Sequence, residues 1–141
     1  MTEYYERTGS SNITGSVGEK VAMRFLARER GFAIMKQSYR KPYGEIDIVA
    51  RETDGTVHFV EVKAQEHEDR AHLERLVERR EYNPEEHVDD RKLQRIARAV
   101  TAWLGEHPET DLWQIDVLAV RFVAREKFAS VNLIENVVRD L

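Results

Sequence analysis

Two β-prone runs joined by an Asp-Gly turn constrain this chain more than any other feature. Residues 44–50 read Gly-Glu-Ile-Asp-Ile-Val-Ala, and residues 56–65 read Thr-Val-His-Phe-Val-Glu-Val-Lys-Ala-Gln. Asp54-Gly55 lies between them, and this dipeptide between two β-prone runs is a strong hairpin signal. We therefore predict two adjacent antiparallel strands, with the rest of the chain arranged around them.

Charged residues share one face of each predicted strand. Side chains alternate between the faces of a strand with a period of two. One face of the pair then carries Glu45, Asp47 and Val49 on the first strand, and Val57, Phe59, Glu61, Lys63 and Gln65 on the second. The other faces carry Ile46, Ile48 and Ala50, and His58, Val60, Val62 and Ala64. Charges on a mostly buried sheet face are rare unless they are paired or bind a metal.

The acidic residues of this face suit a divalent cation. Mg²⁺ takes oxygen ligands and is usually held by one or two carboxylates together with water and substrate phosphate. Asp47 and Glu61 could supply two such oxygens, and Lys63 could orient an attacking water or stabilise charge on a phosphate. The alternative is a pair of solvated strand faces with cross-strand ion pairs.

Helical spacing of apolar residues predicts a helix over residues 16–30, after a flexible tail over residues 1–14. Glu19 falls on the apolar stripe of this helix. It either stabilises the first turn through the helix dipole, or it points over the sheet toward Asp47 and Glu61 as a third acidic group.

The segment after this helix predicts a short strand over residues 32–39 and a turn over residues 40–44. Arg40 and Lys41 lie in the turn, near the expected acidic group. They either contact phosphate or belong to a solvated turn.

Residues 66–83 are densely charged with both signs, which is typical of a solvated helix or of a mobile flap over the site. Asn83-Pro84 is a strong helix start, and the apolar stripe that follows ends at Gly105. The opposite face of this second helix is basic, and it is either solvated or a candidate for phosphate contacts. Its residues are Arg91, Lys92, Arg95 and Arg98.

Residues 112–123 alternate and are rich in β-branched side chains, so they predict another strand, and residues 128–138 predict a last strand or a short helix. The resulting order is helix, three strands, helix, strand, with a possible last strand. This order predicts one mixed α/β domain over residues 15–141, with a mixed central sheet flanked by helices.

Composition limits the function classes. The chain has 141 residues, no cysteine and a net charge of −4, and no run approaches the length of a membrane span. We expect a cytoplasmic protein without a membrane partner. Zinc-binding histidine pairs, nucleotide-binding loops and the hydrolase elbow are missing from the sequence. Because affinity for DNA comes mainly from Lys and Arg, a DNA-binding role requires a local basic patch, a bound metal, or both.

Three motifs together resemble a known family. Gly18-Glu19, the run 44–47 (Gly-Glu-Ile-Asp) and the run 59–63 (Phe-Val-Glu-Val-Lys) resemble those of the YraN-type family of uncharacterised bacterial proteins. That family belongs to the PD-(D/E)XK, or restriction-endonuclease-like, nuclease superfamily and is similar to archaeal Holliday-junction resolvases. The resemblance covers roughly residues 15–138 and implies a restriction-endonuclease-like fold.

The resemblance also implies roles for single residues. Asp47 and Glu61 would bind Mg²⁺ or Mn²⁺, Lys63 would assist the attacking water, and Glu19 would be an accessory acid. Glu45 belongs to the family motif without an obvious role. The chain departs from the family pattern at two further positions, Gln65 in place of the usual Arg and Ser38 in place of the usual Asn, and Ile46 replaces the proline of the superfamily.

Two functional hypotheses follow. The first is a metal-dependent endonuclease that hydrolyses phosphodiester bonds in DNA. A narrower version of this hypothesis is an endonuclease selective for branched structures, for which a homodimer would place two sites on opposed strands. The second is a non-catalytic nucleic-acid or protein interaction module built on the same fold.

Overall fold

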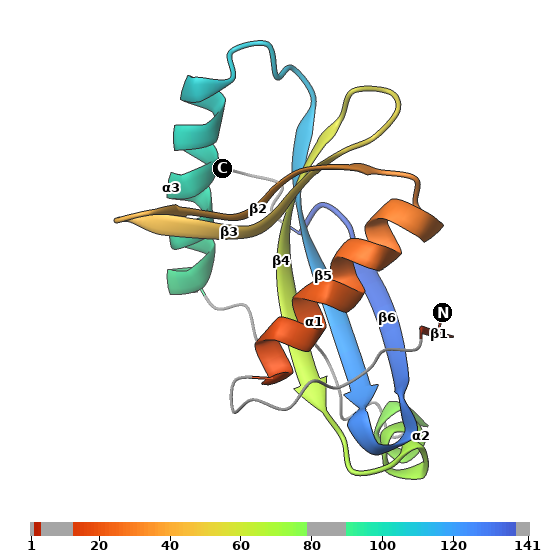
Figure 1. The fold of residues 1–141 in the computed structure, drawn as a ribbon. Helices are drawn as coiled ribbons and strands as arrows, with labels where there is room; N and C mark the ends of the chain where they lie inside the picture. The colour runs from red at the N-terminus through yellow and green to blue at the C-terminus, as the bar shows by residue number, and fades with distance from the viewer. Residues whose placement is uncertain (1, 4–12, 79–89, 138–141) are drawn as a thin grey trace.

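The helices and strands follow the predicted order. The computed structural model describes residues 2–3, 13–78 and 90–137 (Figure 1). The elements in chain order are β1 (Thr2–Glu3), α1 (Ile13–Arg24), a π-helical extension (Phe25–Glu29), β2 (Ala33–Lys41), β3 (Gly44–Arg51), β4 (Val57–Glu66), α2 (Arg70–Glu78), α3 (Asp90–Glu106), β5 (Trp113–Val123), a 3₁₀ turn (Ala124–Glu126) and β6 (Phe128–Ile134). The segment predicted as a last strand or short helix is therefore strand β6.

In the described residues the strands form one six-stranded sheet in the order β1-β6-β5-β4-β3-β2. β4 and β5 are parallel, and the other neighbours are antiparallel. A parallel pair needs a crossover connection, and α2 and α3 lie in the segment between β4 and β5. The predicted mixed α/β architecture, with a mixed sheet flanked by helices, is confirmed.

The hairpin between β3 and β4 forms where the Asp-Gly dipeptide predicts it. The Glu52 amide donates to the Thr56 carbonyl at 2.9 Å, and the Asp54 carboxylate accepts the Thr56 amide at 2.9 Å. Gly55 has a φ of +96°, a backbone conformation that residues other than glycine rarely adopt. The turn thus fixes the antiparallel register of the two strands that carry the predicted site residues.

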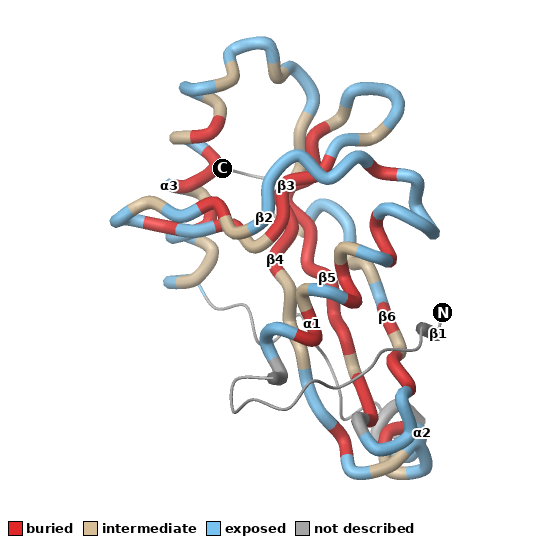
Figure 2. The backbone as a smooth tube through the Cα atoms, viewed as in Figure 1, coloured by how far each residue is buried: buried red, intermediate tan, exposed pale blue. Residues whose placement is uncertain are grey.

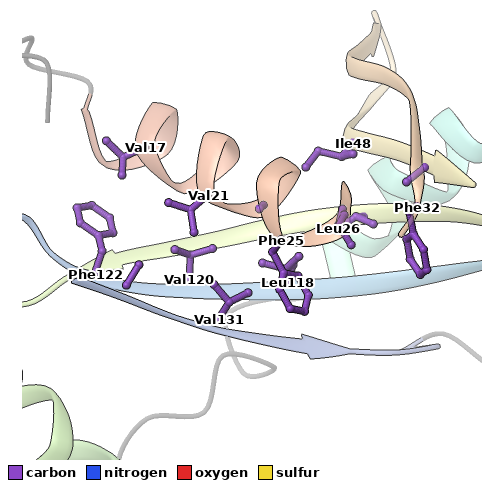
Figure 3. Packing of buried hydrophobic residues seen from close by; sticks show 14 residues of the cluster. Val17, Val21, Phe25, Leu26, Phe32, Ile48, Leu118, Val120, Phe122 and Val131 are labelled. Carbon is purple, nitrogen blue, oxygen red and sulfur yellow. The ribbon is translucent and has the colours of Figure 1, made fainter. Parts of the chain in front are cut away.

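Helix α1 and its π-helical extension cover one face of the sheet, across β4 and β5 (Figure 1). Figure 3 shows the apolar side chains that fill this interface. They include Val17, Val21, Phe25 and Leu26 from the helical segment, and Ile48, Val60, Leu118, Val120 and Phe122 from the strands. Val62 and Ala64 pack against the same cluster, so the alternation predicted for β4 holds. The helix also lies very close to β4: a Cβ atom added to Gly18 would lie 2.4 Å from the Ala64 Cβ.

Helix α3 packs on the opposite face, against β3 and the core of the hairpin. The second apolar cluster combines Ile96, Ala99, Val100 and Trp103 of α3 with Tyr39, Ile46, Val49, Val57, Phe59 and Ile115 of the sheet. The buried positions in Figure 2 run along β3, β4 and β5, between the two helical layers. Gly44 is the point of closest approach, because a Cβ atom there would lie 2.0 Å from the Arg95 carbonyl oxygen.

The prediction that Ile46 and Ile48 lie on the same face of the sheet is wrong. Ile46 packs in the α3 cluster, whereas Ile48 packs in the α1 cluster, so the alternation of β3 breaks between them. Ser38 lies opposite this break on β2 and has a φ of +57°. Beyond it the β2–β3 hairpin turns away from β4 toward α3 (Figure 1). The prediction assumed a regular strand, and the alternation of apolar and polar residues in the sequence does not reveal this distortion.

Three predictions fall partly outside the described residues. Thr2–Glu3 pairs with β6, but residues 4–12 lie outside the described part, so the flexible tail stays a prediction. In the predicted flap, Leu73 of α2 is buried against the end of β5 and the start of β6. Residues 79–89, with the predicted helix start at Asn83, are also outside the description. None of the described helices is both long and apolar enough to cross a membrane.

Candidate metal centre

The predicted acidic pair lies where β3 leaves β4. The ladder between the two strands ends at the pair Ile48 and Val60, one residue before Asp47 and Glu61 come opposite each other. The Asp47 carboxylate accepts a hydrogen bond from the Val62 amide at 2.8 Å. A side chain of β3 therefore takes the amide of β4 as its partner where the two strands separate. This hydrogen bond fixes the Asp47 carboxylate beside β4.

Glu61 is buried, with 4% of its side chain exposed, and two amines lie against it. The Lys92 Nζ lies 2.6 Å from the Glu61 Oε1, and the Lys63 Nζ lies 3.8 Å from the same oxygen. Because Val62 and Ala64 face α1, Glu61 and Lys63 face the side that carries α3. Two carboxylates and two amines thus come together from β3, β4 and α3.

The acids and amines of the group perturb one another. Burial and the charge of Asp47 raise the pKa of Glu61 to about 7, although Lys92 acts in the opposite direction. Burial and the neighbouring Lys92 lower the pKa of Lys63, against the attraction of Glu61 and Asp47. Perturbed pKa values with identifiable charged partners are typical of functional sites. Glu61 therefore holds a proton to higher pH than an exposed glutamate does, although an amine lies against it.

Lys92 lies in this group rather than only on a solvated helix face. Burial acts against its charge, but hydrogen bonds with Glu61 and Lys63 and the charges of Glu61 and Asp47 raise its pKa above the usual value. The sequence placed Lys92 on the basic face of this helix, as either a solvated residue or a phosphate contact. Its approach to Glu61 was missed, because the period of the helix does not reveal a contact with β4.

Glu19 of α1 is partly buried and lies in the neighbourhood of Asp47. Burial and the charges of Asp47 and Glu45 raise its pKa, and a hydrogen bond with Gln37 lowers it. Helix α1 begins at Ile13, so Glu19 does not lie in its first turn, and the helix-dipole interpretation is wrong. The charge effect of Asp47 places Glu19 in its neighbourhood, and a role as a third acidic group stays a prediction. In the described part of the chain, however, Glu19, Asp47 and Glu61 do not form a set whose ligand atoms all lie within 4.8 Å of one another.

Of the remaining predicted residues, some lie near this centre and others do not. Glu45 is exposed and lies 3.8 Å from Arg40, whose charge also lowers the pKa of Glu19. Lys41 instead pairs with Glu106 of α3 at 3.4 Å. Gln65 is exposed near the end of β4. The structure thus brings Arg40 near the centre, engages Lys41 elsewhere, and leaves Gln65 on the surface along the strand of Lys63.

The donor set defines what the centre can do. Proteins usually hold Mg²⁺ and Mn²⁺ with one or two carboxylates, which Asp47 and Glu61 can supply here. A divalent cation beside Asp47 and Glu61 would oppose the effects of burial and of the Asp47 charge, which together raise the pKa of Glu61. The residues present therefore fit such an ion.

Comparison with known proteins gives the family. The profile of the uncharacterised protein family UPF0102 matches residues 18–120, which include all of the carboxylates and amines described above. The chain is 33% identical to a UPF0102 protein of Roseiflexus castenholzii over 135 residues, which cover 94% of this chain and 98% of that one. It is 30% identical to a UPF0102 protein of Helicobacter hepaticus over 128 residues, which cover 91% and 96%. A UPF0102 protein of Corynebacterium efficiens is 36% identical over 94 residues, 66% of each chain. Because the family profile matches residues 18–120 and the relatives from Roseiflexus castenholzii and Helicobacter hepaticus align over nearly their whole length, the chain belongs to the uncharacterised protein family UPF0102.

Proposed function

We propose that this protein is a divalent-metal-dependent nuclease that hydrolyses phosphodiester bonds in DNA. One observation carries the proposal: Asp47 and Glu61 meet beside Lys63 at the point where two neighbouring strands separate. The resemblance to the restriction-endonuclease-like superfamily adds support, because the same three residue types carry its motif.

Asp47 and Glu61 would hold Mg²⁺ or Mn²⁺. The bound ion would lower the pKa of water and stabilise charge on the scissile phosphate. The Val62 amide orients the Asp47 carboxylate for this role. The burial of Glu61 excludes water from one side of the pair, which strengthens its electrostatic interactions.

The amines serve the proton and phosphate steps. Because its pKa is lowered, Lys63 is neutral in a larger fraction of molecules than an exposed lysine, so its Nζ can accept the proton of the attacking water. Hydrolysis forms a bond from the water oxygen to phosphorus and breaks the bond to the leaving oxygen. Lys92 keeps its charge and is placed to interact with a phosphate oxygen once Glu61 has another cation as its partner.

Binding of DNA would depend on basic groups near the centre rather than on the overall charge of the protein. The net charge of −4 disfavours non-specific binding, so phosphate contacts have to come from groups near the centre. Arg40 and Lys92 are the candidates that the structure brings there. With DNA as the substrate, we expect the protein in the cytoplasm. If the enzyme prefers junctions, as the resemblance to resolvases suggests, sedimentation should show a homodimer.

The proposal is tested by cleavage assays with Mn²⁺ and Mg²⁺ on duplex, single-stranded, flap and junction DNA. Asp47→Asn retains an oxygen that can accept the Val62 amide, so it should remove activity while the fold survives. We expect a loss of at least about 100-fold from Asp47→Asn and from Lys63→Met. Glu109→Gln, at an exposed position beyond α3, is the matched control and should cleave as the wild type does. If all four substrates remain intact with both metals, the chain is not this nuclease.

A non-catalytic interaction module is the second candidate. It is favoured by the close Lys92–Glu61 pair, which partly neutralises the acidic group without any added ion. Calorimetric titration with Mn²⁺ separates the two candidates. Saturable binding that Asp47→Asn abolishes supports the metal centre, whereas binding that is missing or unchanged in this variant supports the module.

A further inference from the structure

A second polar cluster lies on the opposite face of β4, centred on His58. Its side chain is fully buried and stacks on Phe32 with ring centroids 4.4 Å apart. The His58 Nδ1 lies 2.5 Å from a carboxylate oxygen of Asp116, which is also fully buried. The other oxygen of Asp116 accepts hydrogen bonds from the Gln114 amide group at 2.8 Å and from the Asn136 backbone amide at 2.9 Å. Asp116 is thus held in place, and it fixes the orientation of the His58 ring.

The other ring nitrogen of His58 faces two glutamates from different segments. The His58 Nε2 lies 2.6 Å from the Glu52 Oε1, at the turn between β3 and β4. Glu135 follows β6, and one ligand atom from each of Glu52, His58 and Glu135 lies within 4.8 Å of the others. In the described residues this is the one set of three such side chains that is close enough to hold a metal ion.

We propose that His58, Glu52 and Glu135 form a binding site for a transition-metal ion of the Zn²⁺ class. One imidazole nitrogen and two carboxylate oxygens are ligands that Zn²⁺ accepts, and catalytic and exchangeable zinc sites keep a further position for water. A metal-ligating histidine usually donates its other N–H to a carboxylate, which is the position that Asp116 occupies. Mg²⁺ prefers sites made of oxygen alone, so the imidazole distinguishes this site from the Asp47–Glu61 centre.

The geometry requires only small adjustments. Zinc–ligand bonds of about 2.0–2.1 Å in a tetrahedron place ligand atoms roughly 3.3 Å apart. The Glu52 oxygen, now 2.6 Å from Nε2, would have to withdraw by about 0.7 Å, and the Glu135 oxygen, which lies within 4.8 Å of both, would have to reach a similar spacing. Their side chains are 34% and 45% exposed, so both can move without disturbing the core, whereas His58 and Asp116 are fixed.

A cleft lies beside one of the three ligands. It has a volume of about 420 Å³ and is lined by Glu52 and by the neighbouring residues Gly31, Ala33, Arg51, Thr53, Asp54 and Gly55. Glu135 is meanwhile held by Arg30 at 3.3 Å and by Gln114 at 3.5 Å. An incoming ion therefore competes with Arg30 for Glu135 and with the Nε2 proton of His58, which would be released to solvent on binding. The bound ion would tie the β3–β4 turn to the segment after β6.

The site is tested with Zn²⁺ alone, by calorimetry on the full chain, and with Co²⁺, by visible absorption. The reference is the Asp47→Asn chain, because this substitution removes a ligand of the other proposed centre. We expect one Zn²⁺ ion per chain in this reference. Adding Glu135→Gln or Glu52→Gln should weaken binding by at least about 10-fold and reduce the tetrahedral Co²⁺ spectrum.

Two controls make the result specific. Glu109→Gln, an exposed substitution outside the cluster, should leave Zn²⁺ affinity unchanged. The His58 ring signals in the NMR spectrum should shift on Zn²⁺ addition in the reference chain. The proposal is overturned if the reference chain shows no saturable Zn²⁺ binding, or if Glu52→Gln and Glu135→Gln bind Zn²⁺ as the reference does. Because no step depends on DNA cleavage, this outcome is separate from the fate of the proposed nuclease.

Discussion

In the metal-free protein, Glu61→Gln should raise the free energy of unfolding above that of the wild type by an amount that grows from acidic to alkaline pH. Glu61 is buried beside Asp47, and this environment raises its pKa from 4.5 to about 7. The native state therefore holds a proton on Glu61 to higher pH than the unfolded state does. By linkage, the wild type loses stability as pH rises between these two values. A glutamine has nearly the same shape and carries no charge, so the variant escapes this loss.

The magnitude follows from the shift in proton affinity. At about 1.4 kcal/mol for each tenfold change in affinity, the full shift corresponds to roughly 3 kcal/mol. Part of this loss has already occurred at about pH 5, so about 2.5 kcal/mol remains between about pH 5 and about pH 8. The attraction of Lys92 is already included, because it acts on the pKa of Glu61. Effects of the substitution on packing do not depend on pH and cancel when the two conditions are compared.

The assay is urea unfolding at both pH values, with a chelator present, for the wild type, Glu61→Gln and Glu45→Gln. Glu45 is exposed near the same centre, so its variant is the matched control and should differ from the wild type equally at both pH values. We expect the advantage of Glu61→Gln over the wild type to grow by about 2.5 kcal/mol from about pH 5 to about pH 8. A constant difference, within about 0.5 kcal/mol, would refute the argument that Asp47 and burial suppress the ionisation of Glu61.

Three further outcomes can be checked on single variants. Gly44→Ala should destabilise the fold by about 2–3 kcal/mol in urea unfolding, because its Cβ would meet the Arg95 carbonyl. Gly105→Ala has open space around it in α3, so in the same assay it should be neutral or stabilising by up to about 1 kcal/mol. Ser38→Asn should stabilise by about 0.5 kcal/mol in thermal unfolding, because asparagine tolerates the positive φ better than serine does. Gln65→Arg should strengthen DNA binding in fluorescence anisotropy and steepen its dependence on salt by roughly one phosphate contact, and an unchanged salt slope would mean that Gln65 lies away from the DNA.

Local pattern was sufficient to predict the hairpin and the facing of β4. Turn chemistry at Asp54-Gly55 fixed the register, and in a paired strand the register decides which side chains can meet. Asp47 and Glu61 were therefore predictable as neighbours before any coordinates. The break in β3 was not, because it depends on the positive φ of Ser38 and on the approach of α3 to Gly44, neither of which alters the hydrophobic period.

The glycines of the family motif also acquire a physical reason. Gly18 and Gly44 each precede a predicted acid, Glu19 directly and Asp47 by three positions. Both allow a helix to approach the sheet without space for a Cβ atom: α1 at Ala64 and α3 at Arg95. The motif therefore encodes how close the two helices lie as well as the acids themselves. Larger side chains at either glycine should displace a helix and move Glu19 or Lys92 relative to the acidic pair.

The groups that sequence reasoning missed share one property, which is that tertiary contact alone brings them together. Lys92 reaches Glu61 from α3, which is separated from β4 by residues 67–89, and its own helix pattern places it on a charged face. Glu52, His58 and Glu135 come from a turn, a strand and the segment after the last strand, so a search for short histidine motifs does not find them. Their meeting depends on β4 pairing with β5 in parallel, which places Asp116 beside His58 and sets the end of β6 near the turn. A parallel pair has no local sequence signal like that of a hairpin. The sequence could therefore predict Asp47 and Glu61 as neighbours on the hairpin, but not the cluster that the parallel pair brings together.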